Sequence, residues 1–94
     1  MREVTTEERA EAEERWAGKD NYGKPRIEYF DKVVAMDNAA LEKETEKKIW
    51  LSAFAANNRR SDYHWHVDIL YPECQKRDKG MYQRAYDRAI ASCS

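Results

Sequence analysis

The chain has 94 residues, of which 37% are charged and 12% aromatic, and its net charge is −1 at neutral pH. No apolar run approaches the roughly 18 residues of a membrane span, and the near-neutral charge is unlike the strongly basic domains typical of nucleic-acid binders. The aromatic content argues against wholesale disorder. We therefore expect one domain over residues 1–94, with a small aromatic core under a charged surface.

The first segment, residues 1–18, predicts a charged helical arm. Thr5 and Glu8 fit a capping box at the start of a helix, and Gly18 fits its end. Because the segment has almost no apolar face, we expect it to be exposed and held to the body by Trp16.

The rest of the chain divides into a loop at residues 19–26 and a helical body at residues 27–94. Two helices are expected first, the second of them capped by Asp37 or Asn38. We expect Glu44 and Lys48 to form an i,i+4 ion pair on the exposed face of this second helix. The predicted apolar positions of the two helices are Ile27, Phe30, Val33, Val34, Leu41, Ile49, Trp50, Ala53 and Phe54.

The stretch from Arg59 to Tyr71, R-R-S-D-Y-H-W-H-V-D-I-L-Y, is compatible with two structures. A strand at residues 63–71 would place His64 and His66 on one face and give an α+β fold. A helix capped by Ser61 would separate the two rings by about 200°, at roughly 100° per residue. The core stripe of this helix would comprise Tyr63, Val67, Leu70 and Cys74. We expect the helix, because no other segment alternates as a partner strand would. The expected fold is therefore all-α, a compact bundle of four or five short helices with an exposed N-terminal helical arm.

Pro72 is the main objection to that helix, since a proline in a helix interior costs about 3 kcal/mol or more. We expect a kink near Tyr71, or an end there and a restart with Pro72 at the first helical position. Residues 73–80 then form a polar turn, and residues 81–92 a last helix packed on the Trp65 segment. The apolar stripe of this last helix comprises Met81 or Tyr82, Ala85, Tyr86, Ala89 and Ile90.

The chemistry-bearing residues form no complete catalytic or metal motif. His64, His66, Cys74 and Cys93 are competent zinc ligands, but their spacing is not that of a zinc finger. A nucleophilic pair of Cys74 with either histidine would have to form in space. We expect reduced thiols in a cytoplasmic protein, no enzymatic activity and no cofactor. A metal-binding module or enzyme that uses His64 and His66 is the second alternative.

The remaining signal is a surface rich in tyrosine, tryptophan and arginine, the residue types that most often dominate binding energy at protein interfaces. We expect a non-enzymatic protein that binds a protein or protein complex, and a homodimer is compatible with this. The alternative is a nucleic-acid binder in which the same arginines contact phosphates. The predicted partner-binding residues are Arg59, Arg60, Tyr63, His64, Arg84 and Arg88.

In size and composition the chain looks like the short accessory and inhibitor proteins that bacteriophages use against host defence, including anti-CRISPR proteins. This resemblance covers no particular residues and no motif. It implies an inhibitor that acts by docking on a protein complex, without chemistry of its own.

Overall fold

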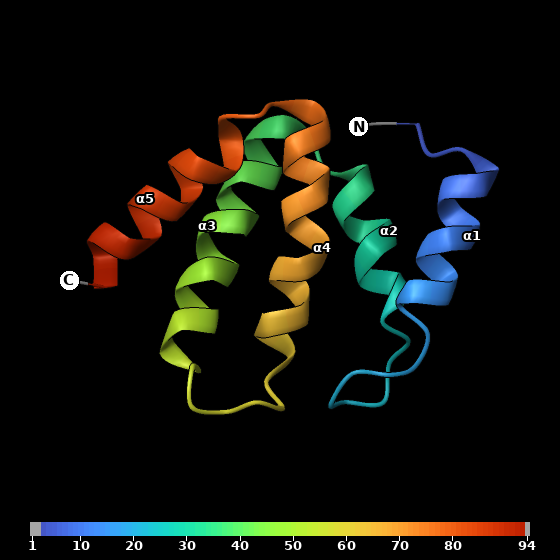
Figure 1. Cartoon of the computed structure of the whole chain (residues 1–94), viewed down its shortest axis with the longest axis horizontal. Helices are drawn as coiled ribbons and strands as arrows, with labels where there is room; N and C mark the ends of the chain where they lie inside the picture. The colour runs from blue at the N-terminus through green and yellow to red at the C-terminus, as the bar shows by residue number, and fades with distance from the viewer. Residues whose placement is uncertain (1–2, 94) are drawn as a thin grey trace.

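The computed structural model describes residues 3–93 and consists of five α-helices (Figure 1). The predicted all-α fold is confirmed, and the residues of the alternative strand, 63–71, lie inside a helix. Within the described residues, no helix combines the length and apolar character needed to cross a membrane. The helices are α1 (Thr6–Arg15), α2 (Ile27–Ala35), α3 (Asn38–Phe54), α4 (Asp62–Arg77) and α5 (Met81–Cys93).

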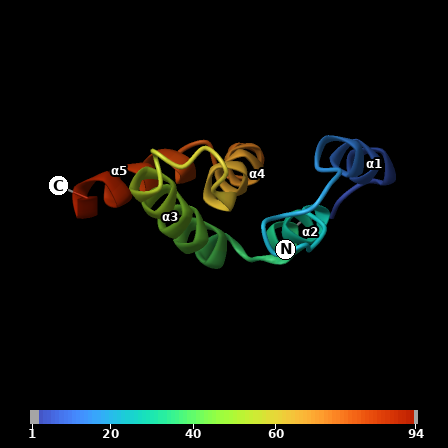
Figure 2. The same ribbon diagram turned by 90° about the horizontal axis from the view of Figure 1, so that it is seen from below.

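The molecule is a thin slab with principal extents of 41 × 29 × 15 Å. Seen from below, the helices follow a shallow zigzag in the order α1, α2, α4, α3, with α5 beside α3 (Figure 2). α4 occupies the middle and contacts α2, α3 and α5. Because the slab is only about one to two helices thick, several helix faces remain uncovered.

The main core lies around α4, where Leu70 and Cys74 pack against Val33 of α2 and Leu41 of α3. All four side chains are fully buried. Leu70 and Cys74 belong to the helical stripe that the sequence predicts, so this part of the core is foreseeable from the 3.6-residue repeat.

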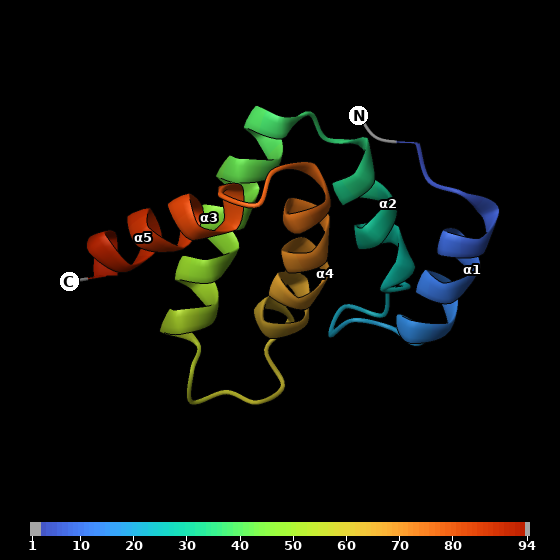
Figure 3. The ribbon, with the colours of Figure 1, turned by 45° about the horizontal axis from the view of Figure 1, so that its top comes forward.

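A second, smaller core forms where α5 crosses α3 (Figure 3). Ala85 and Ala89 of α5 are buried there against Ile49 of α3. The last helix therefore packs mainly on α3, and the predicted contact with α4, the helix that holds Trp65, is the smaller of the two. The two alanines allow a close approach to α3, and the bulkier half of the predicted stripe turns toward solvent.

α4 runs as one helix with Pro72 inside it, so the predicted end and restart at this residue do not occur. The turn predicted at residues 73–80 is confined to residues 78–80, because residues 73–77 are helical and Glu73 and Cys74 are buried. The gain from burying the last turns of α4 outweighs the hydrogen bond that proline removes.

The helix starts agree with the capping prediction. Thr5, Asp37 and Ser61 each accept a hydrogen bond from a backbone N–H two or three residues ahead. The first helix ends at Arg15, earlier than Gly18, whose φ of +105° belongs to the following loop. The starts are local features, which explains why the sequence predicts them.

α1 lies at one end of the slab and is largely exposed, as predicted for an arm (Figure 1). Ala12 is its buried residue, and the Trp16 ring lies 6.2 Å from that of Trp65, centroid to centroid. Arg9 binds both carboxylate oxygens of Asp31 on α2, each at 2.9 Å. A tryptophan contact and a bidentate ion pair therefore hold the arm.

Candidate functional site

Two loops meet at one end of the molecule, the loop between α1 and α2 and the loop between α3 and α4 (Figure 1). The backbone N–H of Asn21 donates to both carboxylate oxygens of Asp62, each at 3.2 Å. The side-chain amide of Asn21 donates to the carbonyl of Arg60 at 2.7 Å. We call the surface formed by residues 19–24 and 57–63 the loop end. Asn21 joins its two halves.

The first half of the loop end is a tight turn built around Asp20. Its carboxylate accepts hydrogen bonds from the backbone N–H groups of Tyr22 and Lys24, at 2.8 and 2.9 Å. The bond from Lys24 is the main reason that the pKa of Asp20 lies below its usual value. Gly23 supplies the positive φ of +81° that the turn requires. The turn projects Tyr22, whose surface is 86% exposed.

The second half of the loop end presents Arg59 and Arg60, both of which are exposed. Among the described residues, neither guanidinium has a hydrogen-bond or ion-pair partner. Both groups are therefore available to an outside ligand. This agrees with the sequence-based placement of the two arginines on a turn before α4.

A cavity of about 360 Å³ opens between the two halves of the loop end. Asp20 and Asp62 line it on the loop side, and Tyr63, Lys48 and His66 line it on the helix side. The lining therefore carries both signs of charge together with aromatic rings. Such a mixture suits polar side chains of a partner better than it suits one uniformly charged ligand.

The ion pair of Glu44 and Lys48 lies beneath this cavity and is not exposed, contrary to the sequence-based prediction. The two side chains are 14% and 13% exposed and their charged atoms lie 3.8 Å apart. The Lys48 ammonium stands over the rings of Tyr29 and Tyr63, at 5.5 and 5.3 Å from their centroids. Burial lowers the pKa of Lys48.

The hydroxyl of Tyr29 completes this cluster by donating to the Glu44 carboxylate at 2.7 Å. Burial raises the pKa of Tyr29, and the bond to Glu44 adds to the effect. The hydroxyl therefore stays protonated. The charged and polar groups of Tyr29, Glu44 and Lys48 therefore contact one another or aromatic rings, which indicates a structural role.

The ring of His66 stacks on Tyr29, with 4.1 Å between the centroids. Its Nδ1 is buried and has no hydrogen-bond partner within the part of the chain that the structure describes. Burial, reinforced by the charge of Lys48, lowers the pKa of His66 to about 4. The ring is therefore neutral at pH 7.

His64 fixes the end of α3. Its Nε2 lies 3.2 Å from the carbonyl oxygen of Ala55 and 3.0 Å from that of Asn58, and its Nδ1 lies 2.7 Å from the hydroxyl of Ser52. Because carbonyl oxygens only accept, Nε2 carries the proton and Nδ1 accepts from Ser52. Both ring nitrogens thus serve internal contacts, and His64 shares no site with His66.

Cys74 lies apart from both histidines. It follows His66 by two turns of α4, about 12 Å along the axis, and its sulfur lies 3.3 Å from the hydroxyl of Thr45. Burial raises the pKa of this thiol, which is unfavourable for a nucleophile. Within residues 3–93, no three His, Cys, Asp or Glu side chains are placed to hold a metal ion. The side chain of Cys93 lies outside the described part.

Arg84 and Arg88 belong to an ion-pair ladder between α5 and α3. Arg84 binds Glu42 and Asp78 at 3.0 and 2.8 Å, and Arg88 binds Glu42 and Glu46 at 2.6 and 2.5 Å. Hydrogen bonds from the two arginines hold the pKa of Glu42 below its usual value. The ladder lies beside the first half of α3, whereas residues 57–63 of the loop end come after Phe54, the last residue of α3. The six predicted binding residues therefore form no single surface.

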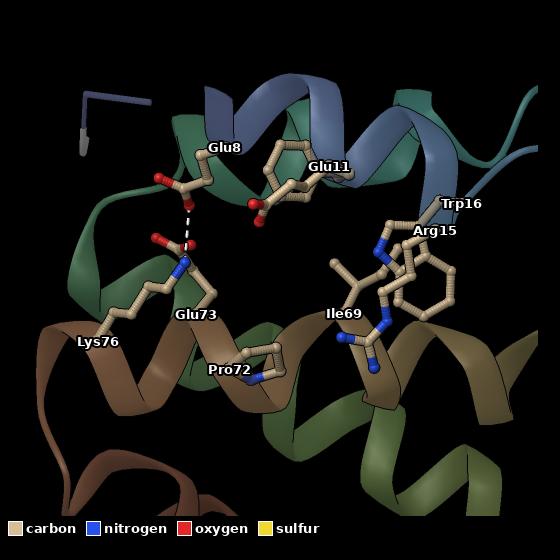
Figure 4. A pocket seen from close by; sticks show the side chains of 10 residues that line it. Glu8, Glu11, Arg15, Trp16, Ile69, Pro72, Glu73 and Lys76 are labelled. Carbon is tan, nitrogen blue, oxygen red and sulfur yellow. Dashed lines mark hydrogen bonds and ion pairs between the residues drawn. The ribbon is translucent and has the colours of Figure 1, made fainter. Parts of the chain in front are cut away.

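A cleft of about 130 Å³, smaller than the cavity of the loop end, separates α1 from α4 (Figure 4). An ion pair between Glu8 and Lys76, 2.8 Å long, spans it at one side, and Trp16 lies beside Ile69 at the other. Pro72 also lines the cleft. The cleft is thus the seam along which the arm docks. Its two cations make contacts within the protein: Lys76 pairs with Glu8, and the guanidinium of Arg15 lies over the Trp16 ring, 5.1 Å from its centroid.

No family model, curated protein or solved structure matches this chain. We therefore infer the function from the geometry of the loop end. Sequence reasoning identified Arg59, Arg60 and Tyr63 but missed Tyr22. A tyrosine between turn-forming residues, as in D-N-Y-G, is the signal that could have located it.

Proposed function

We propose that this protein binds another protein through the loop end, without catalysing a reaction. The observation that carries the proposal is the exposure of two arginines without internal partners, Arg59 and Arg60, on the same surface as the projecting ring of Tyr22. Tyrosine and arginine contribute the largest binding energies at many protein interfaces. The complementary partner surface would place carboxylates opposite the two guanidinium groups, which bind them in a bidentate manner, and polar groups opposite Asp20 and Asp62.

The internal bonds of the loop end support this function. Asn21 ties one loop to the other through Asp62 and the carbonyl of Arg60, and Asp20 holds its own turn closed. Loops that are already ordered lose less conformational entropy when they bind. The site is thus held on a rigid helical scaffold, the usual arrangement for binding loops.

The charges of the loop end favour a protein partner over nucleic acid. Asp20 and Asp62 line the cavity of the loop end, and carboxylates there repel a phosphate backbone. Arg84 and Arg88, which a phosphate-binding surface would need, are already paired with acidic side chains. The protein-binding proposal therefore uses Arg59, Arg60 and Tyr63, together with Tyr22.

The experiment is affinity capture from bacterial lysate with the tagged chain, after nuclease treatment, with identification by mass spectrometry. A single stoichiometric protein complex is expected for the native chain. The double variant Arg59→Glu and Arg60→Glu should lose it while keeping its helical circular dichroism. Equal recovery by this variant, or recovery that depends on intact nucleic acid, would contradict the proposal.

A control is the double variant Arg84→Gln and Arg88→Gln, which removes two positive charges at a distance from the loop end. It should retain the partner. The same substitution to glutamine at Arg59 and Arg60 provides its charge-matched counterpart, which should lose the partner. If the captured partner is an enzyme or defence complex, loss of that complex's activity on binding would extend the proposal to an inhibitor of the phage type, which the chain's size and composition suggest.

A further inference from the structure

A second surface, separate from the loop end, is an apolar groove of about 240 Å³ where α3, α4 and α5 meet. Its apolar lining consists of Ile49, Ala53, Val67, Tyr82, Tyr86 and Ile90. Tyr71 extends the groove along α4, since its ring lies 4.8 Å from that of Tyr82. We call these seven residues the tyrosine groove.

The tyrosine groove gathers three of the large apolar side chains that the fold leaves exposed. Tyr71, Tyr86 and Ile90 are 49%, 42% and 39% exposed. In addition, the hydroxyls of Tyr71, Tyr82 and Tyr86 have no hydrogen-bond partner among residues 3–93. Apolar bodies with free polar tips are suited to an interface that is dry at its centre and polar at its edge.

Two acidic residues, Asp68 and Asp87, adjoin residues that line the tyrosine groove, although no charged side chain of either sign lines it among the described residues. Asp68 lies close enough to Tyr82 to raise the pKa of that hydroxyl, an effect secondary to burial. Asp87 follows Tyr86 on α5 and accepts a hydrogen bond from Gln83. A partner would therefore complement the groove with apolar side chains flanked by positive charges.

The exposed area is too small for a stable dimer of this chain. The exposed fractions of the three side chains correspond to roughly 200–300 Å², taking about 150–250 Å² for each large side chain. A stable interface buries about 800 Å² on each partner. A symmetric dimer would also bring the two acidic residues of one copy toward those of the other. A single helix that inserts a few side chains matches the area better.

From this groove, its free hydroxyls and the two adjoining acidic residues, we propose that the tyrosine groove binds an amphipathic helix of a partner protein, with apolar anchors one turn apart and lysine or arginine beside them. The anchors occupy the space between Val67, Tyr86 and Ile90. The flanking cations face Asp68 and Asp87. This surface acts independently of the loop end, so either can exist without the other.

The test uses designed helical peptides of about 16 residues, long enough to hold a helix, with leucine or phenylalanine at i, i+3, i+4 and i+7. Each lysine-flanked peptide has a glutamate-flanked twin, and binding to the full chain is followed by fluorescence anisotropy. We expect at least one lysine-flanked peptide to bind with a sub-millimolar Kd and about fivefold more tightly than its twin. Binding by no peptide, or equal binding by both twins, would overturn the proposal.

Variants locate the binding. Tyr86→Ser, at a residue that is already exposed, should weaken the lysine-flanked peptide several-fold and leave the melting transition nearly unchanged. Phe54→Ser is the matched control, since Phe54 is 81% exposed but lies outside the groove, and it should bind as the native chain does. Equal weakening by both variants would overturn the assignment. Concentration-dependent dimerisation that Tyr86→Ser abolishes would also overturn it, because the occupant would then be a second copy.

Discussion

Glu73 and Arg77 form a buried ion pair on the last turns of α4, with 2.8 Å between the charged atoms and side chains that are only 4% and 6% exposed. The same guanidinium donates to the carbonyls of Val34 and Met36 at the end of α2. One arginine therefore satisfies a buried carboxylate and the end of a neighbouring helix at once. This relationship explains why α4 stays helical beyond its proline.

Replacing Arg77 with methionine should destabilise the fold by about 3–5 kcal/mol, because Glu73 would remain buried without its guanidinium. Urea unfolding followed by circular dichroism measures this loss. Adding Glu73→Gln in the same chain should recover part of the stability. Arg84→Gln, at an exposed ion pair, should change the unfolding midpoint far less, and equal losses in the two single variants would refute the role given to Arg77.

Pro72→Ala should stabilise the chain by about 1–3 kcal/mol, because alanine restores a backbone hydrogen bond inside a helix that is already continuous. The urea midpoint should rise with little change in the slope of the transition. Pro72 also lines the seam with α1, and the small loss of contact there limits the gain. A clear fall in the midpoint would show that the proline contributes packing that outweighs its helix penalty.

Trp16→Ala should release α1 from the body, since this ring and Ala12 provide most of the arm's apolar contact. A detached helix of 10 residues is too short to persist in water. Amide hydrogen exchange should therefore accelerate across residues 6–15, while α3 and α4 keep their protection. Unchanged exchange in α1 would mean that the Arg9 and Asp31 ion pair holds the arm without the tryptophan.

Acidification should destabilise the native chain through His66. Its pKa is lowered from 6.5 to about 4, so between these pH values the unfolded chain binds the proton that the folded ring refuses. The contribution of His66 to the free energy of unfolding is fully present above pH 6.5. It decreases as the pH falls toward 4, by about 1–2 kcal/mol after allowance for the partial exposure of the ring. Lys48 opposes protonation, whereas Asp62, Glu44 and Asp20 favour it.

The His66→Asn variant provides the comparison for this pH effect. Its urea midpoint should change less than that of the native chain between pH 7 and pH 4.5. NMR titration of the native His66 ring should give a midpoint near 4. A midpoint near 6.5 would mean that the ring is hydrated and would remove the predicted difference between the two chains.

Local signals in the sequence predict the helix starts at Thr5, Asp37 and Ser61, because a cap involves residues only two or three positions apart. The proline rule fails at Pro72, where contacts with distant residues decide the outcome. The Arg77 bonds to the end of α2 span more than 40 residues and have no signature in the sequence.

In the candidate site, too, local features are predictable from the sequence, whereas contacts between distant residues are not. Arg59 and Arg60 are exposed on a turn, as the sequence indicates, since a turn after a helix end needs no partner to define it. The pairing of Arg88 with Glu46 depends on how α5 packs against α3, and the burial of Lys48 depends on its contacts with Tyr29 of α2 and Tyr63 of α4. The link from Asn21 to Asp62 joins residues 41 positions apart, so the neighbourhood of Tyr22 emerges only in the folded chain.

The central claim is that the loop end is the surface by which this protein binds its partner. The most direct measurement is amide hydrogen exchange of the full chain, free and in complex with the captured partner. We predict that new protection concentrates in residues 19–24 and 57–63, while α1 is unchanged. Protection that spares these two segments and appears elsewhere on the molecule would contradict the account.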